Sequence, residues 1–373
     1  MSRMTPQQRM MAVYRGQLPD QIPVAIYGRY LPRGSIERMA RELGLAIIDW
    51  HPVASLLAPP WHLQGNYLSE VNGAELSVGY RWENSRRIER RTYRTPVGTV
   101  FQESTVDPTY GSDWIQRFYI QGPEDYKVVT YLVEHTVLRR QENGLRAAAE
   151  NLGTDGVVLG RIDRSPYQKV LIELAGPERF LTDLYTEPEP VLGLLEAIDR
   201  RMDDVFAMVL KSQAEVIWQP ENVTVDLTPP AAFEKYCVPF YAKHGSRLHD
   251  AGKRYVVHLD GRLRPLKGLI ARAAFDAVDS FSVPEAGGDM TMAEAIASWP
   301  AKAVLPNFPS PLCHRPDAEI LSFLERLIAE AGVGRPWMLQ LSEDIPPGQW
   351  QRVAPLLCRW MGVYGRCDHQ VPV

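Results

Sequence analysis

The chain has 373 residues, 45% hydrophobic and 23% charged, as is typical of globular proteins, and its net charge of −4 does not favour nucleic acid or an anionic membrane as partner. No segment approaches the roughly 18–20 apolar residues of a membrane span, the N-terminus lacks a signal-peptide core, and the four cysteines share no C-x-x-C spacing. We therefore expect a cytoplasmic protein with reduced thiols.

The N-terminal residues predict a helix and then a strand–helix–strand pattern. Thr5 and Gln8 suit the N-cap and capping-box positions of a helix that has Pro6 as its first residue and ends near Gly16. The elements expected next are a strand at 22–28, a helix at 34–45 and a strand at 46–53. The chain thus begins with a helical extension that precedes the first strand.

Residues 73–122 differ in character from the rest of the chain. They alternate apolar and polar residues and are rich in Val, Tyr and Thr, which is typical of half-buried strands. The sequence TPVG at 95–98 has the proline and glycine of a hairpin turn. We expect a small antiparallel sheet, inserted into a single domain that spans 1–373.

The remaining chain alternates short apolar strands with amphipathic helices. The expected strands are 156–161, 214–220, 253–260, 278–284, 303–308 and 337–343. With the two N-terminal strands they make eight βα units, which close into a (β/α)₈ TIM barrel of the α/β class. A doubly wound open sheet is the competing fold, but the first strand leads into YGRYLPRG, which lacks the Gly-rich phosphate turn of that fold.

Polar residues at the carboxyl ends of barrel strands are the candidates for chemistry. Arg29 follows the first strand and could hold a carboxylate or form only a rim salt bridge. Asp226 is a proton donor or substrate ligand, or else the acceptor of a turn. The residues expected to bind substrate are Arg29, Tyr27, Trp218, Asn307 and Glu285.

The sequence RYVVHLD at 254–260 carries the sharpest signal. His258 and Asp260 are two residues apart on a strand, so they share a face. Together with Glu343 at the end of the eighth strand, they could bind Zn²⁺ or another divalent ion. The alternative is a metal-free site in which Asp260 orients His258 as a general acid or base. A purely structural pair is the third interpretation.

Several segments resemble the uroporphyrinogen decarboxylase superfamily. TPQQRMMAVYRGQLPDQIPV resembles its opening, GRYLP at 28–32 is similar to a stretch of the decarboxylases, and the segment from PVGTVFQE to DYKVVTYLVE resembles the superfamily's methyltransferase-like branch. Ala25 and Ile26 stand where the decarboxylases have the arginine of MRQAGR, which argues against uroporphyrinogen as the substrate. The resemblance is closer to the methyltransferase-like branch.

The resemblance implies a barrel that moves a methyl group between a small substrate and a corrinoid protein or tetrahydrofolate. Thiol-activating members bind zinc through H-x-C and a later cysteine; here His258-Leu259-Asp260 and Glu343 match those positions with carboxylates, which suits an oxygen-bearing substrate. The chain has no cobalamin-binding D-x-H-x-x-G segment, so cobalamin would be carried by a partner protein. A homodimer is also implied. The alternative function is a decarboxylase or lyase that holds a carboxylate substrate with Arg29.

Overall fold

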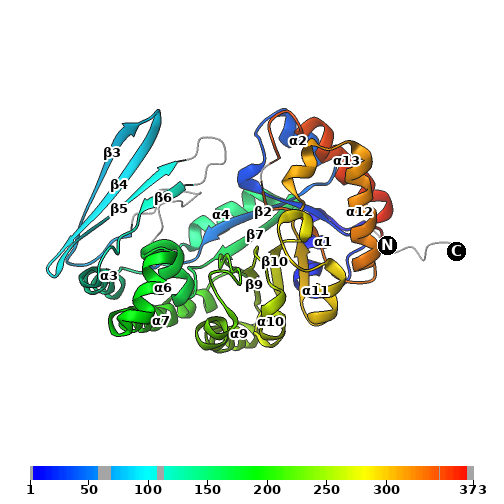
Figure 1. Cartoon of the computed structure of the whole chain (residues 1–373). Coiled ribbons are helices and arrows are strands. Elements are labelled where there is room, and N and C mark those ends of the chain that lie inside the picture. Colours follow the sequence, from blue (N-terminus) through cyan, green and yellow to red (C-terminus); the bar gives the residue numbers. More distant parts are fainter. Residues whose placement is uncertain (1–2, 58–68, 107–112, 344, 368–373) are drawn as a thin grey trace. The chain divides into compact units, whose positions relative to one another are not determined.

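The computed structural model of the chain describes residues 3–57, 69–106, 113–343 and 345–367 (Figure 1). It divides into two compact units. The barrel unit comprises Met1–His51, Glu142–Arg161 and Gln213–Val373, and the second unit comprises Pro52–Gln141 and Ile162–Ser212. None of the described helices combines the length and hydropathy that crossing a lipid bilayer requires.

The barrel unit contains eight strands in one sheet. They are β1 (Val24–Tyr27), β2 (Ala46–Pro52), β7 (Gly156–Arg161), β8 (Val216–Gln219), β9 (Arg254–His258), β10 (Ala277–Phe281), β11 (Ala303–Pro306) and β12 (Leu339–Leu341). The sheet is parallel and has the order β11-β10-β9-β8-β7-β2-β1-β12. Parallel bridges between Val304 and Trp337 and between Asn307 and Gln340 join its two ends. The predicted TIM-barrel-like fold is therefore confirmed, and the open sheet is excluded.

Helices surround these strands, as Figure 1 shows for α9 to α13. The longer ones are α1 (Pro6–Tyr14), α2 (Ser35–Glu42), α4 (Glu142–Leu152), α9 (Val238–Asp250), α10 (Lys267–Arg272), α11 (Met292–Ser298), α12 (Asp317–Ala331) and α13 (Trp350–Tyr364). Helix α1 begins as predicted, because the Thr5 hydroxyl accepts from the Gln8 amide at 3.2 Å and the Gln8 side chain accepts from the Thr5 amide at 2.9 Å.

Short helical segments lie mainly between the strands and the longer helices. They are η1 (Gly28–Tyr30), η2 (Gly153–Asp155), α8 (Pro230–Ala232), η4 (Phe233–Cys237), η5 (Arg264–Leu266), η6 (Pro284–Ala286) and η7 (Ser310–His314). Most carry proline in their first turn, where the missing amide hydrogen would be unpaired in any helix. The prolines of these segments therefore begin helical turns that follow strands.

The second unit contains the predicted antiparallel sheet. Its strands, β3 (Glu75–Glu83), β4 (Arg86–Thr95), β5 (Gly98–Val106) and β6 (Asp113–Arg117), pair in chain order. The expected turn at 95–98 joins β4 to β5. The helices of this unit are α3 (Pro123–His135), α5 (Pro166–Lys169), η3 (Val170–Leu174), α6 (Pro177–Thr186) and α7 (Pro188–Leu210).

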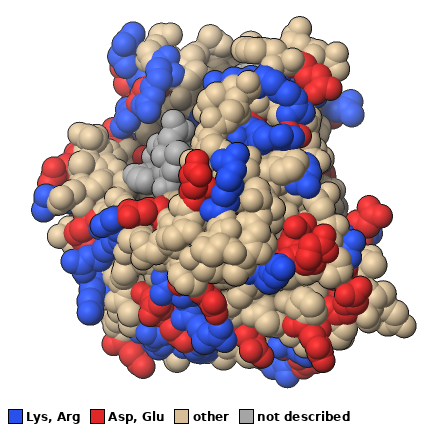
Figure 2. Space-filling model, turned by 90° about the vertical axis from the view of Figure 1, so that its left-hand side faces the viewer, with Lys and Arg blue, Asp and Glu red and all other residues tan. Residues whose placement is uncertain are grey.

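A buried ion network stabilises the second unit. The ammonium of Lys169 lies 2.9 Å from Asp163 Oδ1 and 2.8 Å from Glu173 Oε2, and Arg164 Nε lies 3.0 Å from Glu173 Oε1. Two cations thus balance two carboxylates away from water, as buried charges require. On the molecular face shown in Figure 2, acidic and basic side chains are interspersed, consistent with the small net charge.

Close packing between β2 and β7 yields a test of the barrel. A methyl group at Gly156 would overlap the backbone carbonyl of Ile47, whereas one at Gly268 in α10 would meet no atom within 4 Å. We expect Gly156→Ala to destabilise the protein by about 1–3 kcal/mol, typical of overpacking. Gly268→Ala should stabilise it by up to about 1 kcal/mol, because alanine favours a helix. Urea unfolding measures both, and equal effects would contradict this packing.

Candidate active site

Asp279, a buried carboxylate on β10, is the centre of the polar site. Its Oδ2 accepts hydrogen bonds from the Tyr27 hydroxyl at 2.6 Å, the Trp218 indole N–H at 2.7 Å and His258 Nδ1 at 2.9 Å. Its Oδ1 accepts from the Gln340 amide at 2.6 Å. These donors come from β1, β8, β9 and β12, and they compensate for the removal of the charge from water. The pKa of Asp279 is lowered: burial opposes ionisation, but the hydrogen bond from His258 and the others outweigh it.

His258 lies between two carboxylates. Its Nδ1 bonds to Asp279, and its Nε2 lies 3.3 Å from Asp260 Oδ2. A carboxylate is only an acceptor, so both ring nitrogens act as donors and the ring is an imidazolium. Burial alone would lower the pKa of His258, but attraction to Asp260 and Asp279 raises it to about 9. The ring is therefore charged at neutral pH.

Asp260 faces partly outward, with 36% of its side chain exposed. The amide of Asn222 donates to Asp260 Oδ2 at 2.9 Å. Burial opposes ionisation of Asp260, but attraction to His258 prevails and lowers its pKa. Asp260 is thus an ionised acceptor. His258 Nε2 faces this partly exposed carboxylate, whereas Nδ1 faces the fully buried Asp279.

A β-bulge in β10 contributes to the position of Asp279. Pairing with β11 shifts register between Val278 and Phe281, and Ser280 has φ +57°, which is unfavourable for a residue other than glycine. The side-chain oxygen of Gln340 accepts from the Ser280 amide at 2.8 Å, and the two hydroxyls of Ser280 and Ser342 lie 2.6 Å apart. Gln340 therefore holds both the bulge and the carboxylate that precedes it.

Glu343 and Asn307 extend the polar group toward β12. The Asn307 side chain, which is buried, hydrogen-bonds Glu343 and also accepts from the Ser342 amide at 3.2 Å. Desolvation and repulsion by Asp260 raise the pKa of Glu343, although the bond from Asn307 opposes them. Asp260 and Glu343, which follow the fifth and eighth barrel strands, therefore repel each other.

Aromatic rings line the same region. The rings of Tyr27 and Trp50 meet edge to face at 4.4 Å between centroids, and the Trp50 and Trp218 rings lie 5.0 Å apart. Arg29 donates to the Tyr30 hydroxyl at 2.7 Å, and its guanidinium lies 4.4 Å from the centre of that ring. The predicted residues Tyr27, Arg29 and Trp218 therefore occur in one aromatic and polar cluster.

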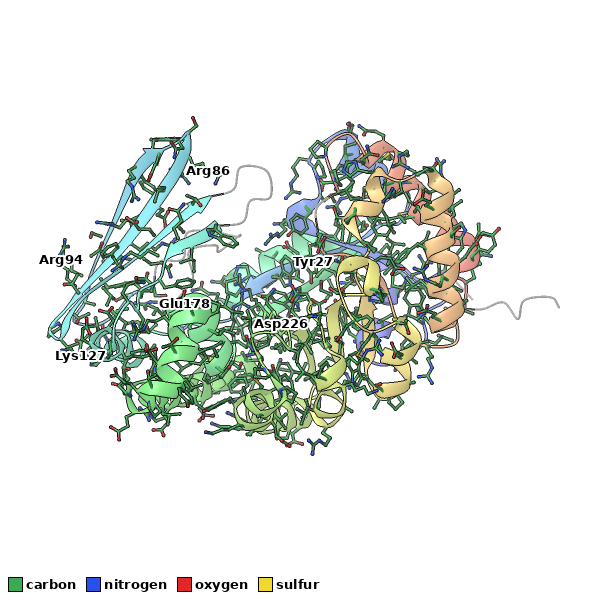
Figure 3. The ribbon with its side chains drawn as sticks, in the orientation of Figure 1. Tyr27, Arg86, Arg94, Lys127, Glu178 and Asp226 are labelled. Atoms are coloured by element: carbon green, nitrogen blue, oxygen red, sulfur yellow. The ribbon has the colours of Figure 1, made fainter. Side chains whose placement is uncertain are left out.

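Two predicted site residues belong to other contacts. Asp226 pairs with Arg262, whose Nε lies 3.0 Å from its Oδ2, and this hydrogen bond lowers the pKa of Asp226, which disfavours the predicted role of proton donor. Glu285 pairs with Arg326 on α12. Figure 3 marks Asp226 and Tyr27. Each carboxylate thus has an arginine as its partner, whereas the carboxylates at His258 are those of Asp260 and Asp279.

The sequence prediction missed Asp279 and Gln340. A signal for the first was present, since an aspartate inside the apolar run AVDSF is unusual for a buried strand and requires partners. No comparable signal identifies Gln340, because it gains its role only by lying across the barrel closure from Ser280.

The expected metal site does not fit this arrangement of donors. An imidazole binds a metal through a nitrogen lone pair, but both nitrogens of His258 donate to carboxylates. Among the residues that the structure describes, no three His, Cys, Asp or Glu side chains are grouped so that they could hold a metal ion. We therefore derive no chemical step through a metal at His258, Asp260 and Glu343, and that assignment stays a prediction.

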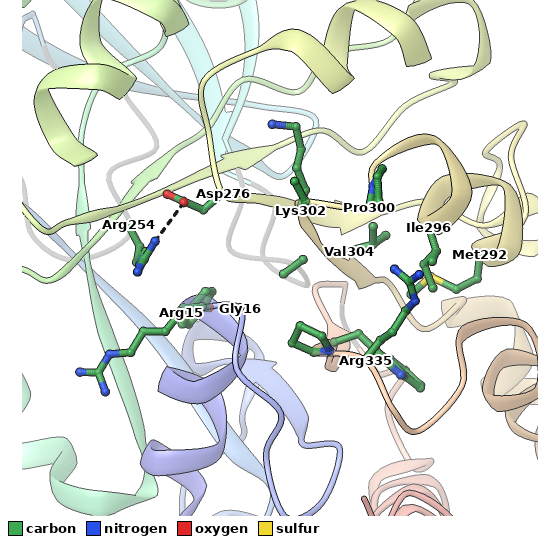
Figure 4. Close-up of a pocket in the computed structure, with 15 residues that line it drawn as sticks. Arg15, Gly16, Arg254, Asp276, Met292, Ile296, Pro300, Lys302, Val304 and Arg335 are labelled. Atoms are coloured by element: carbon green, nitrogen blue, oxygen red, sulfur yellow. Dashed lines mark hydrogen bonds and ion pairs between the residues drawn. The ribbon is translucent and has the colours of Figure 1, made fainter. Parts of the chain in front are cut away.

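A pocket at the amino ends of the strands has four basic residues on its lining, but most are already paired (Figure 4). Arg254 lies 3.4 Å from Asp276, Arg15 pairs with Glu215, and the ammonium of Lys302 donates to the Ala273 and Phe275 carbonyls. Its cations serve neighbouring protein groups, so we place the candidate active site at the carboxyl ends.

Comparison with known proteins gives two findings. The family model described as uroporphyrinogen decarboxylase (URO-D) matches residues 169–351. A solved structure described as a methyltransferase from Methanosarcina mazei is similar with a TM-score of 0.59 and 14% sequence identity, over 97% of this chain and 100% of that chain. No curated protein matches the sequence. The matched segment, 169–351, includes Trp218, His258, Asp260, Asp279 and Gln340.

Replacing the central carboxylate should change the titration of His258. Asp279→Asn keeps the volume but removes a charge bonded to Nδ1, so we expect the pKa of His258 to fall by about 1–3 units. NMR of ¹³C-labelled histidine, assigned with His258→Gln, measures this. Asp226→Asn is the matched control and should leave the His258 pKa unchanged. A His258 that titrates near 6.5 in the unmodified protein would contradict the assigned network.

The same network makes stability depend on pH. Because folding raises the pKa of His258 from about 6.5 to about 9, its stabilising effect is fully present below pH 6.5 and is lost as pH rises through 9. Unfolding free energy should fall by up to about 1.4 kcal/mol per pH unit in that window. His258→Gln should remove this pH-dependent part of the stability. The measurement is the unfolding free energy in urea as a function of pH, compared between the unmodified protein and His258→Gln. Parallel profiles would refute it.

Proposed function

We propose that the chain, of which residues 169–351 match the uroporphyrinogen decarboxylase family model, is a methyltransferase of that superfamily. It would move a methyl group between a small oxygen-bearing substrate and an acceptor on a partner protein. The similarity to the Methanosarcina mazei methyltransferase supports the choice of this branch. A corrinoid carried by the partner would supply the nucleophile that takes the methyl group. Tetrahydrofolate is the alternative acceptor.

The position of His258 between the Asp260 and Asp279 carboxylates is the observation that carries this proposal. When a methyl–oxygen bond breaks, the oxygen keeps the bonding electrons and needs a proton. His258 Nε2 lies 3.3 Å from Asp260, and it would donate this proton once the substrate oxygen replaces Asp260 as its acceptor, while Nδ1 stays bonded to Asp279. An acid with a pKa of about 9 is charged at neutral pH, and it is well matched to a phenol-type leaving group, whose pKa is about 10. Solvent would return the proton beside the partly exposed Asp260.

A carboxy-lyase is the second candidate, and the geometry favours it less. Asp260 and Asp279 flank His258, so a carboxylate substrate would meet repulsion. Arg29, which would have to hold that substrate, already bonds to Tyr30. The site therefore suits a neutral oxygen-bearing substrate better than an acid.

Release of the demethylated product tests the proposal. The purified protein is incubated with reduced free cobalamin and a panel of aliphatic and aryl methyl ethers, and the alcohol or phenol is quantified. His258→Gln should lower the rate by about 10²–10⁴-fold, the usual contribution of a general acid. His135→Gln, an exposed histidine of α3, is the control and should retain the rate. The rate should fall above pH 9, when His258 loses its proton.

Other outcomes identify the competing functions. If the protein releases carbon dioxide from a panel of carboxylic acids and Arg29→Ala abolishes this release, the function is decarboxylation and not methyl transfer. Stoichiometric zinc that is lost in His258→Ala would mean that His258 and Asp260 bind a metal in the functional protein. Methyl transfer that survives His258→Gln at the full rate would refute the role of this residue as the acid.

A further inference from the structure

Trp50, near the end of β2, carries one of several buried polar atoms that lack a hydrogen-bond partner in the described part of the chain. Its side chain is 5% exposed, yet its indole N–H has no hydrogen-bond partner in the described part of the chain. An unpaired buried donor is unfavourable by about 1–3 kcal/mol. Such a group in a native protein calls for an explanation, and a bound ligand is one.

The neighbours of Trp50 show that this donor differs from the others. Tyr27 and Trp218 both contact its ring, and the polar groups of both bond to Asp279. Of these three aromatic residues, Trp50 alone keeps its polar group uncommitted. The indole N–H can only donate, so its partner must be an acceptor such as an oxygen.

We propose that Trp50 Nε1–H binds the substrate, and that the substrate is a planar aromatic compound with an ether or hydroxyl oxygen on its ring. This inference rests on the proposed function and specifies its substrate class. The Tyr27, Trp50 and Trp218 rings pack on one another, and an aromatic ring is the ligand group that adds to such a cluster by stacked or edge-to-face contact. A quaternary ammonium, the other ligand that aromatic residues attract, is disfavoured by the protonated His258, whose ring centre lies 5.7 Å from that of Trp218.

Anisole and ethylbenzene provide a matched pair of probes, because they differ by one ether oxygen in place of a methylene. Binding is followed by NMR of protein with ¹⁵N-labelled tryptophan, in which the Trp50 signal is assigned by its loss in Trp50→Phe. Anisole should shift the Trp50 indole N–H signal saturably and bind about tenfold more tightly than ethylbenzene, a factor equivalent to about 1.4 kcal/mol.

Two tryptophan variants test whether Trp50 is the source of the preference for anisole over ethylbenzene. Trp50→Phe keeps an aromatic ring but removes the donor, so it should bind the two probes equally. Trp114→Phe is the matched control, because Trp114 lies on β6 and is 74% exposed, and it should leave the tenfold preference intact. The shift of the Trp50 signal in the unmodified protein supplies a readout that does not depend on whether Trp50→Phe folds.

Three results would overturn the inference: equal binding of the probes to the unmodified protein, discrimination that persists in Trp50→Phe, or a Trp50 signal that neither probe moves. The last would mean that solvent alone occupies the donor. Because these readouts need no turnover, they separate the two proposals. A protein that prefers anisole to ethylbenzene but does not demethylate ethers would refute methyl transfer, whereas the aromatic ether-binding site at Trp50 would stand.

Discussion

Burial of the Asp279 carboxylate inside a parallel barrel is the constraint on which the site depends. An ionised group removed from water is stable only when hydrogen-bond donors replace its solvation. Four strands supply such donors, from Tyr27, Trp218, His258 and Gln340. One charge therefore sets the orientation of four side chains, and through Gln340 it is coupled to the bulge at the end of its own strand.

The charge state of His258 follows from this arrangement. Burial without partners would favour the neutral ring, but two carboxylates favour the cation and prevail. A cationic imidazole has a proton to donate and no lone pair to offer. His258 therefore acts as an acid, and Asp260 accepts its hydrogen bond. In the H-x-C arrangement of the thiol-activating members, a thiolate would instead lie beside a neutral imidazole. The difference of one residue type changes the chemistry that the position supports.

The two compact units use separate devices to stabilise buried polar groups. The site residues Tyr27, Trp50, Trp218, His258 and Asp279 all belong to the barrel unit. The second unit has its own balanced network around Lys169, with Asp163 and Glu173 as its carboxylates. In both networks each buried charge lies beside an opposite charge. Asp260 of the barrel unit is partly exposed, whereas Asp163, Lys169 and Glu173 of the second unit are buried. Access from solvent is what distinguishes a chemical site from a structural one.

The sequence by itself determined the periodic features: the capped first helix, the antiparallel sheet, the eight βα units, and the closeness of His258 to Asp260, which lies just beyond the end of β9. These depend on neighbours within a few residues, which pattern and turn chemistry report directly. Only the tertiary structure decided the partners. Asp226 and Glu285 pair with arginines 36 and 41 positions away, and Asp279 bonds to Tyr27 across 252 positions. Such contacts arise from strand order and register around the closed barrel, which no local pattern encodes.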